Sequence, residues 1–326
     1  MKSILTLSLL LPSLLFSIQK NIMIHPGVEV PYIPWMTGSL LAPTPINMKP
    51  GHPAIEPSIS IFNTYGEYDS SWKLKSKKSI WAINPLVDFQ FAFTENTGLE
   101  TIASFITSFK DGKSSTYLQD TIVHLGYQIA DDQKDSWVPD LRLLFQTIFP
   151  TGKYRKLSPS KKGIDSTGQG AYFFGPNLSL QKLFYLPCNF FVLHCSFGYF
   201  FPTKAKLKGF NTYGGGYKTK GKLRPGQSMA AFFSGEYSFN QRWVFAYDTA
   251  FFHQRKSSHF RGNPGLTKER TPAKVGLPSS TQISFAPQIE YNFSSNSGLI
   301  MGTWFTLAGR NSKAFASAFL AYLYVF

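Results

Sequence analysis

The sequence has few charged residues, few cysteines and no long hydrophobic run. Of its 326 residues, 16% are charged, against about a quarter in soluble domains. No apolar stretch reaches the roughly 20 residues that a membrane helix needs. Cys188 and Cys195 have a strand-like run between them, which puts their Cα atoms beyond disulfide reach. These shortages argue against a helical membrane protein and a disulfide scaffold, and no ligand pattern predicts a metal or a cofactor.

The one continuous apolar stretch lies at the N-terminus. It runs from Ile4 to Phe16 and follows Met1 and Lys2, which suits the core of a secretory signal peptide. We therefore expect residues 1–17 to be a signal peptide, cleaved near Ser17. The net charge of +15 would favour nucleic acid as a partner in a cytosolic protein. Because the chain is expected to be exported and carries no nucleic-acid recognition motif, we expect no nucleic-acid partner.

Residues 18–53 form a proline-rich arm with seven prolines. Proline removes the backbone donors that a sheet needs, so this segment is not expected to be sheet. It also carries Trp35, Met36, Leu40 and Leu41, which a purely solvated linker would not need. Two interpretations stay open: an irregular arm packed in the mouth of a barrel as a partial plug, or a disordered leader.

Large apolar residues recur at a period of two at the C-terminal end. Leu320, Tyr322, Tyr324 and Phe326 recur at every second position, so in a strand they share one face. In a soluble protein this end strand would be prone to aggregation. The segment resembles the closing strand of a bacterial outer-membrane β-barrel; the alternative is a buried end strand of a soluble β-protein.

Residues 54–326 contain twelve strand-like runs separated by turn signals. Within residues 242–253, for example, Trp243, Phe245 and Tyr247 lie opposite Val244, Ala246 and Asp248. The predicted strands are 54–65, 79–94, 99–109, 116–130, 139–149, 170–185, 189–201, 227–239, 242–253, 281–293, 298–308 and 313–326. We expect an all-β fold, a transmembrane antiparallel up-and-down barrel of about twelve strands.

The connections between these runs alternate between short and long, as in outer-membrane barrels with short periplasmic turns and longer outer loops. Most of the 33 Lys and Arg residues fall in the six longer connections, together with only five acids. Crowded like charges repel one another, and phosphates of the outer leaflet would relieve that repulsion. We expect outer-membrane lipid and lipopolysaccharide as partners; an ordinary solvated surface is the alternative.

If the aromatic faces point to lipid, the opposite faces line a lumen. The polar residues on those faces are Glu56, Asp88, Asp120, His124, Gln128, Arg142, Glu236, Asp248 and Glu290. Six acids against one arginine predict a passage that favours cations. The alternative is a hydrogen-bonded network that fills a narrow barrel, because only barrels of roughly 16 strands or more leave a wide channel.

No enzyme is expected, although two pairs of side chains resemble parts of catalytic sites. His194 and Ser196 share one strand face, and a Ser–His pair can carry acyl chemistry when a third group orients the histidine. No such third group follows in the pattern. Asp120 and His124 also share a strand face, but acid–histidine pairs are common on the polar faces that line a lumen.

Three short motifs resemble a known family. They are Phe149-Pro150-Thr151-Gly152 with Tyr154, Glu290-Tyr291-Asn292-Phe293 before Gly298-Leu299, and Gly309-Arg310-Asn311 leading to Tyr324-Val325-Phe326. Together they resemble a family of outer-membrane transporters associated with the meta-cleavage pathway of phenol degradation. The resemblance implies a barrel of about twelve strands that moves small, often hydrophobic, compounds. It implies no catalytic residues.

The sequence therefore predicts an exported protein of the bacterial outer membrane with its chain ends in the periplasm. The expected function is passive or substrate-selective transport of a small-molecule cargo. The alternatives are a surface adhesion or structural barrel with a plugged lumen and, less favoured, an outer-membrane lipid hydrolase. No oligomeric state is predicted.

Overall fold

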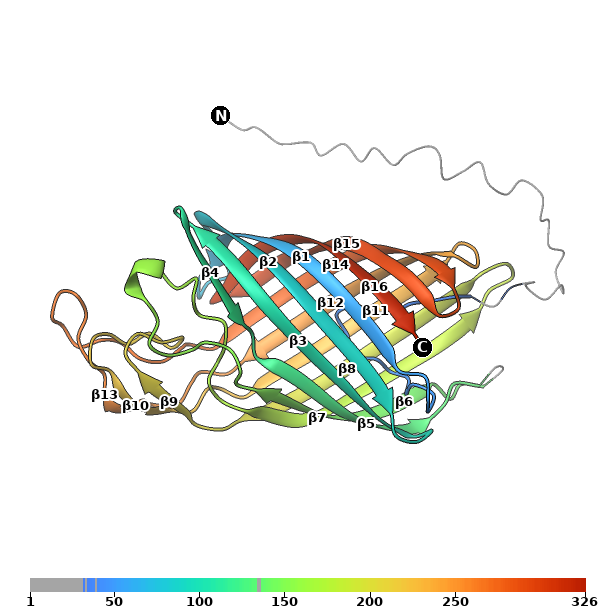
Figure 1. Ribbon diagram of the computed structural model, residues 1–326, viewed down its shortest axis with the longest axis horizontal. Coiled ribbons are helices and arrows are strands. Elements are labelled where there is room, and N and C mark those ends of the chain that lie inside the picture. The colour runs from blue at the N-terminus through green and yellow to red at the C-terminus, as the bar shows by residue number, and fades with distance from the viewer. Residues whose placement is uncertain (1–31, 33, 39, 134–135) are drawn as a thin grey trace, which may run out of the picture.

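The computed structural model describes residues 32, 34–38, 40–133 and 136–326. The expected signal peptide and the first part of the arm lie outside these residues. Figure 1 shows the strands as one oblique wall, with β9, β10 and β13 projecting beyond the end opposite the C-terminus. The strands are β1 (Ala54–Tyr68), β2 (Leu74–Ala92), β3 (Thr97–Lys110), β4 (Lys113–Leu118), β5 (Thr121–Ala130), β6 (Asp140–Phe149), β7 (Phe173–Tyr185), β8 (Phe190–Pro202), β9 (Ala205–Lys208), β10 (Lys220–Leu223), β11 (Ser228–Ser238), β12 (Trp243–Gln254), β13 (Arg261–Asn263), β14 (Ser280–Ser294), β15 (Ser297–Arg310) and β16 (Ser312–Val325).

Antiparallel neighbours close the sheet into a cylinder. The order is β2-β1-β16-β15-β14-β12-β11-β8-β7-β6-β5-β3, and β2 also pairs with β3. Ala54 lies opposite Val325, and the pairing of β1 with β16 continues to Tyr68 and Ser312. Among the described residues the barrel wall thus consists of twelve strands, which we call staves, as the alternation of the sequence predicts. Closure also rules out two stacked sheets as the reason for the alternation.

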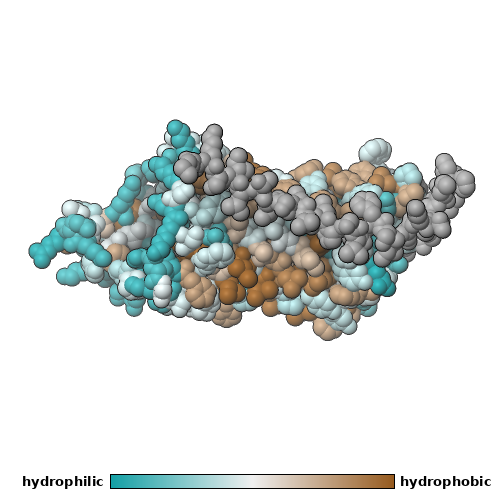
Figure 2. Space-filling model, turned by 90° about the horizontal axis from the view of Figure 1, so that it is seen from above, coloured by the Kyte–Doolittle hydropathy of each residue, from teal (hydrophilic) through white to brown (hydrophobic). Residues whose placement is uncertain are grey.

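The outward faces of the staves are apolar. Leu125, Tyr127 and Ile129 are each about half exposed on β5, whereas His124 and Gln128 at the alternate positions are buried. Figure 2 shows the resulting brown band over the barrel, with a teal end over the outer loops. An apolar outer band with a polar interior is the arrangement of a barrel in a bilayer. Within the described ranges, no helix is long and apolar enough to cross a membrane.

The predicted strand 116–130 is interrupted, and this corrects the sequence analysis. β4 and β5 both pair with β3, but only β5 continues to β6. At the break, the Asp120 carboxylate accepts the backbone N–H groups of Gly152 (2.9 Å) and Gln169 (2.8 Å). The connection between β6 and β7 therefore covers the end of the stave, and the regular ladder stops where its carboxylate turns to the loop.

The outer connections fold over one end of the barrel. Strands β9, β10 and β13 form a separate three-stranded sheet. Its Leu207 and Leu223 pack with Phe173, Phe200 and Tyr213 in a buried cluster. Elsewhere in these connections, Lys162 and Lys78 flank Asp111 and lower the pKa of its carboxyl to about 2. The outer end is thus an ordered cap and not a set of separate loops.

Candidate functional site

Polar side chains line the lumen at the level where the described arm crosses it. Glu56 on β1 lies opposite Asp88 on β2, and Glu100 on β3 lies opposite His124 on β5. The other side of the barrel contributes Glu236 from β11, Asp248 from β12 and Glu290 from β14. Each faces inward because it shares the strand face opposite the lipid-facing aromatics. The layer holds far more carboxyl groups than cationic ones.

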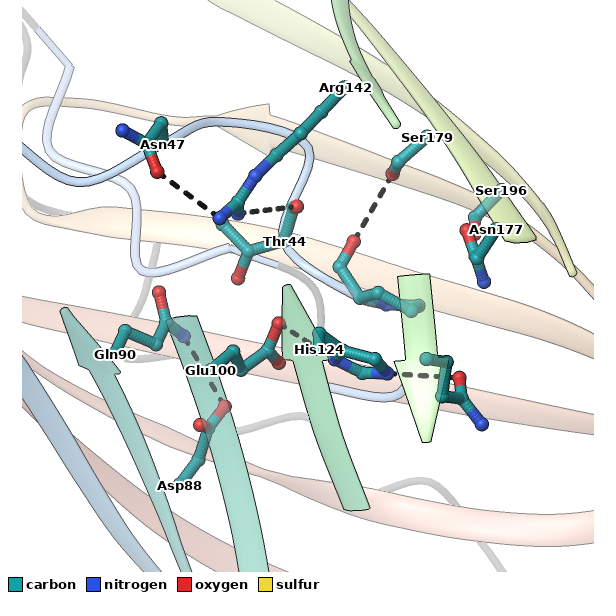
Figure 3. Close-up of polar contacts among 12 residues, drawn as sticks. Thr44, Asn47, Asp88, Gln90, Glu100, His124, Arg142, Asn177, Ser179 and Ser196 are labelled. Atoms are coloured by element: carbon teal, nitrogen blue, oxygen red, sulfur yellow. Dashed lines mark hydrogen bonds and ion pairs between the residues drawn. The ribbon is translucent and has the colours of Figure 1, made fainter. Parts of the chain in front are cut away.

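A buried row connects three neighbouring staves. His124 Nδ1 lies 3.0 Å from Glu100 Oε2, and its Nε2 lies 2.9 Å from Gln146 Oε1. Glu100 and His124 are 3% and 2% exposed. Figure 3 shows the row beside Asp88, whose carboxylate accepts a bond from Gln90. The histidine therefore bonds to Glu100, one of the acids of the layer.

The arm is held to the wall by side chains of this layer. The Thr37 and Leu41 backbone N–H groups donate to Glu290 (3.0 Å) and Asp248 (3.2 Å). Further along, the Asn47 N–H donates to Gln128 (2.9 Å). Since an arm rich in proline offers its remaining amides to no strand, the wall carboxylates satisfy them instead. The arm thus lies across the lumen from β14 to β5.

Arg142 on β6 is the cation of the wall that holds the arm. Its guanidinium donates to the carbonyl oxygens of Thr44 (3.2 Å) and Ile46 (3.0 Å) and to Asn47 Oδ1 (3.2 Å). Figure 3 shows the side chain reaching toward Thr44 and Asn47. A Cβ on Gly126 would lie 2.5 Å from the Arg142 Nε, so glycine is needed at this position. The planar guanidinium holds its N–H donors in a fixed fork, and this fork fits the three acceptor oxygens of the arm.

A cavity of about 870 Å³ lies between the arm and the wall. Glu56, Asp88, Glu100, His124 and Glu236 reach it from the wall. So does a set of inward apolar side chains on the outer side of these acids, which we call the collar: Leu86, Ile102, Ile122, Ile148, Phe200, Ala230, Phe232 and Phe252. Ile102, Ile122 and Ile148 lie side by side on three staves. The lumen therefore has an apolar outer level and an acidic inner level.

The structure places eight of the nine predicted lining residues on the inward faces. Asp120 is the exception, because it lies at the break of its stave and bonds to the loop. Asp120 and His124 accordingly do not form an acid–histidine pair, since His124 bonds to Glu100. A role in transport for the other eight stays a prediction: Glu56, Asp88, His124, Gln128, Arg142, Glu236, Asp248 and Glu290.

Sequence reasoning missed Glu100 and the collar. Glu100 shares a strand face with Ile102 and Ser104, and the same period-two rule that exposed His124 could have found it. The collar lies on the same inward faces, since Phe232 and Phe252 stand four residues from Glu236 and Asp248, but only the polar residues of those faces were predicted to line the lumen. Phe200 shares a face of β8 with His194 and Ser196. The outer cap packs on it, and that contact joins segments far apart in the sequence.

His194 and Ser196 do not form a catalytic pair either. His194 Nε2 lies 2.8 Å from the Ser179 hydroxyl, and the Ser196 hydroxyl donates to Asn177 Oδ1 (2.8 Å). The serine and the histidine therefore bond to different groups on β7. Cys195 lies between them on the outward face, and within the described residues it and Cys188 are both free.

The fold is shared with a solved outer-membrane protein. The COG4313 outer membrane channel from Pseudomonas putida F1 is 13% identical, with a TM-score of 0.64 over 86% of this chain and 97% of its own. The toluene transporter TodX of Pseudomonas putida is 14% identical, with a TM-score of 0.38 over 84% of this chain and 90% of its own. No curated protein sequence matches the chain.

The closed barrel and its apolar band place the protein in the bacterial outer membrane. Its sequence adds the family to which it belongs. Residues 50–322, most of the chain, match one family along the whole barrel. The chain therefore belongs to the family described as "Putative MetA-pathway of phenol degradation".

Proposed function

We propose that the barrel passes small molecules through the outer membrane by way of the cavity between collar and arm. The observation that carries this proposal is a closed wall around about 870 Å³ of space with two kinds of lining. A barrel that served only to display loops would gain from a filled, close-packed interior. The channel and the transporter among the similar solved structures agree with this proposal.

The arm is the moving part in this proposal. It crosses the lumen on hydrogen bonds to Glu290, Asp248 and Arg142, and on the other side of the cavity the cap packs on the collar residue Phe200. A molecule leaving the cavity toward the periplasm must pass the arm. Because these contacts are separate hydrogen bonds to charged side chains, each worth about 1.5 to 3 kcal/mol, local release of the arm is accessible without unfolding the barrel.

The charge of the acidic level gives the passage a preference. Glu56, Asp88 and Glu236 line the cavity, and Arg142 is engaged by the arm. Carboxyl groups in a narrow, low-dielectric opening attract cations and repel anions. We therefore propose selectivity for positively charged or neutral cargo over anions.

Planar bilayers test the passage directly. The purified full-length protein should give discrete current steps, and in a gradient of KCl the reversal potential should have the sign of a K⁺-selective pore. The control is the same detergent extract without the protein. A barrel that inserts but carries no current, or one that selects chloride, would contradict the proposal.

Two other functions are less well supported. A lipid hydrolase would need Ser196 and His194 to act together, yet they bond to Asn177 and Ser179. A purely adhesive barrel gives no role to the lumen cavity. We propose that the chain is not an enzyme and that the outer connections are not its main functional part.

A further inference from the structure

We infer that the cavity binds an organic cation, an apolar body that carries one protonated amine, with the amine at the Glu236 carboxylate and the body against the collar. This inference rests on the proposed passage and names its cargo by chemical class. It is carried by the layering of the lumen, in which one apolar level lies directly outside one acidic level.

Glu236 is a carboxylate of the acidic level that awaits a partner. It is 3% exposed, lines the cavity, and its Oε2 has no hydrogen-bond partner among the described residues. Asp248 and Glu290, which are close enough to interact with it electrostatically, bond to the arm. A buried carboxylate without a partner is costly, and an ammonium group supplies both the charge and the donors that it lacks.

The collar favours an apolar body over a hydrated metal ion. Phe232 and Phe252 stack edge to face with their ring centroids 5.5 Å apart, and Phe232 lies on the same face of β11 as Glu236. A hydrated inorganic ion gains little from such walls, whereas an alkyl or aryl group gains by burial. The apolar level thus binds one end of the molecule and the acidic level binds the other.

Calorimetry with three probes of one shape tests the site. Hexylammonium, hexanol and hexanoate are titrated into the full chain in detergent micelles, with protein-free micelles titrated identically. We expect saturable binding of hexylammonium that is at least tenfold tighter than that of hexanol, and no binding of hexanoate. Equal affinity for hexylammonium and hexanol, or no saturable binding of either, would overturn the inference.

Two variants test which level of the lumen binds which part of the probe. Glu236→Gln should weaken hexylammonium at least tenfold and leave hexanol unchanged, whereas Phe232→Ala should weaken both probes. Glu95→Gln removes an exposed acid in a short turn and is the matched control, with wild-type binding expected. Unchanged binding of hexylammonium to the Glu236→Gln variant would overturn the inference. Binding is measured without transport, so a site that binds in a barrel without current would refute the passage and leave the site standing.

A second inference comes from the register of the small outer sheet. Lys222 on β10 lies opposite Lys206 on β9 and Arg261 on β13, and Lys220 lies opposite Lys208. Residues directly opposite one another point to the same side of a sheet, so five cations share one face. All five are exposed, and none forms an ion pair with an acid in the part of the chain that the structure describes.

This arrangement costs stability unless an anion is present. Like charges directly across strands are destabilising, and the other face of the sheet fixes the geometry because Ala205, Leu207 and Leu223 are buried in the cap. The cationic face consequently points away from the buried cluster of the cap. We propose that it binds phosphate groups of the lipopolysaccharide that surrounds the barrel in the outer leaflet, since several lysines on a fixed sheet suit a phosphorylated surface.

Thermal unfolding in detergent tests this face. Lipopolysaccharide should raise the midpoint for the wild-type protein, and Lys206→Gln with Lys222→Gln should lose at least half of that shift. Lys268→Gln with Lys274→Gln removes two exposed charges from the connection between β12 and β14, outside the sheet, and should keep the full shift. An equal shift with dephosphorylated lipopolysaccharide, or with inorganic phosphate alone, would contradict the proposed partner, as would an unchanged shift in the Lys206 and Lys222 variant.

Discussion

Fixing the arm to the wall with a disulfide should stop most of the current through the barrel. A Cβ added to Gly298 on β15 would fall onto the Thr37 side chain of the arm. Thr37→Cys with Gly298→Cys therefore places two thiols within bonding reach. Cys188→Ser and Cys195→Ser remove the two native thiols, both of which are exposed. In the oxidised protein we expect conductance in planar bilayers to fall at least tenfold, because the arm can no longer leave the lumen.

Reduction provides the internal control for this experiment. Dithiothreitol should restore the current of the double variant to that of the protein without cysteines, and each single cysteine variant should conduct in both redox states. A disulfide that forms, as seen by mass spectrometry, while the current continues unchanged would show that cargo and ions do not need the arm to move. The barrel would then conduct around the arm.

The architecture could be predicted because a barrel wall is encoded locally. Alternation along residues 242–253 fixes which side of β12 meets lipid, and the alternation of short and long connections fixes the ends of the staves. The break between β4 and β5 could not be predicted in this way. It depends on the Asp120 carboxylate meeting the amides of Gly152 and Gln169, a contact between segments with no sequence signature in common.

The site was predictable only as a list of inward polar residues. Alternation places Glu236 and His124 inside, but it cannot say that His124 bonds to Glu100 while Glu236 Oε2 lacks a partner among the described residues. Those differences arise from neighbours across the sheet and from the path of the arm. The collar was missed for a different reason: alternation puts Phe252 on the same face of β12 as Asp248, but only polar residues were selected from the inward faces.

Replacing Arg142 should release the arm and open the lumen. Arg142→Met keeps much of the side-chain length and removes the donors to Thr44, Ile46 and Asn47. A hydrogen bond from a charged group contributes about 1.5 to 3 kcal/mol, so loss of the fork should weaken the hold on the arm by about 3 kcal/mol. This corresponds to about a hundredfold more of the released state. We expect the open probability in planar bilayers to rise several-fold.

Two further variants separate loss of this contact from loss of charge. Arg142→Lys keeps the positive charge but not the planar fork, so its open probability should lie between the wild type and Arg142→Met. Arg242→Met removes an exposed arginine near a short turn, where it donates to the Tyr291 hydroxyl, and should behave as the wild type. If Arg142→Met leaves the open probability unchanged while the barrel stays folded, the arm is held by its other contacts, among them those with Glu290, Asp248 and Gln128. The gate would then depend on those contacts and not on the guanidinium of β6.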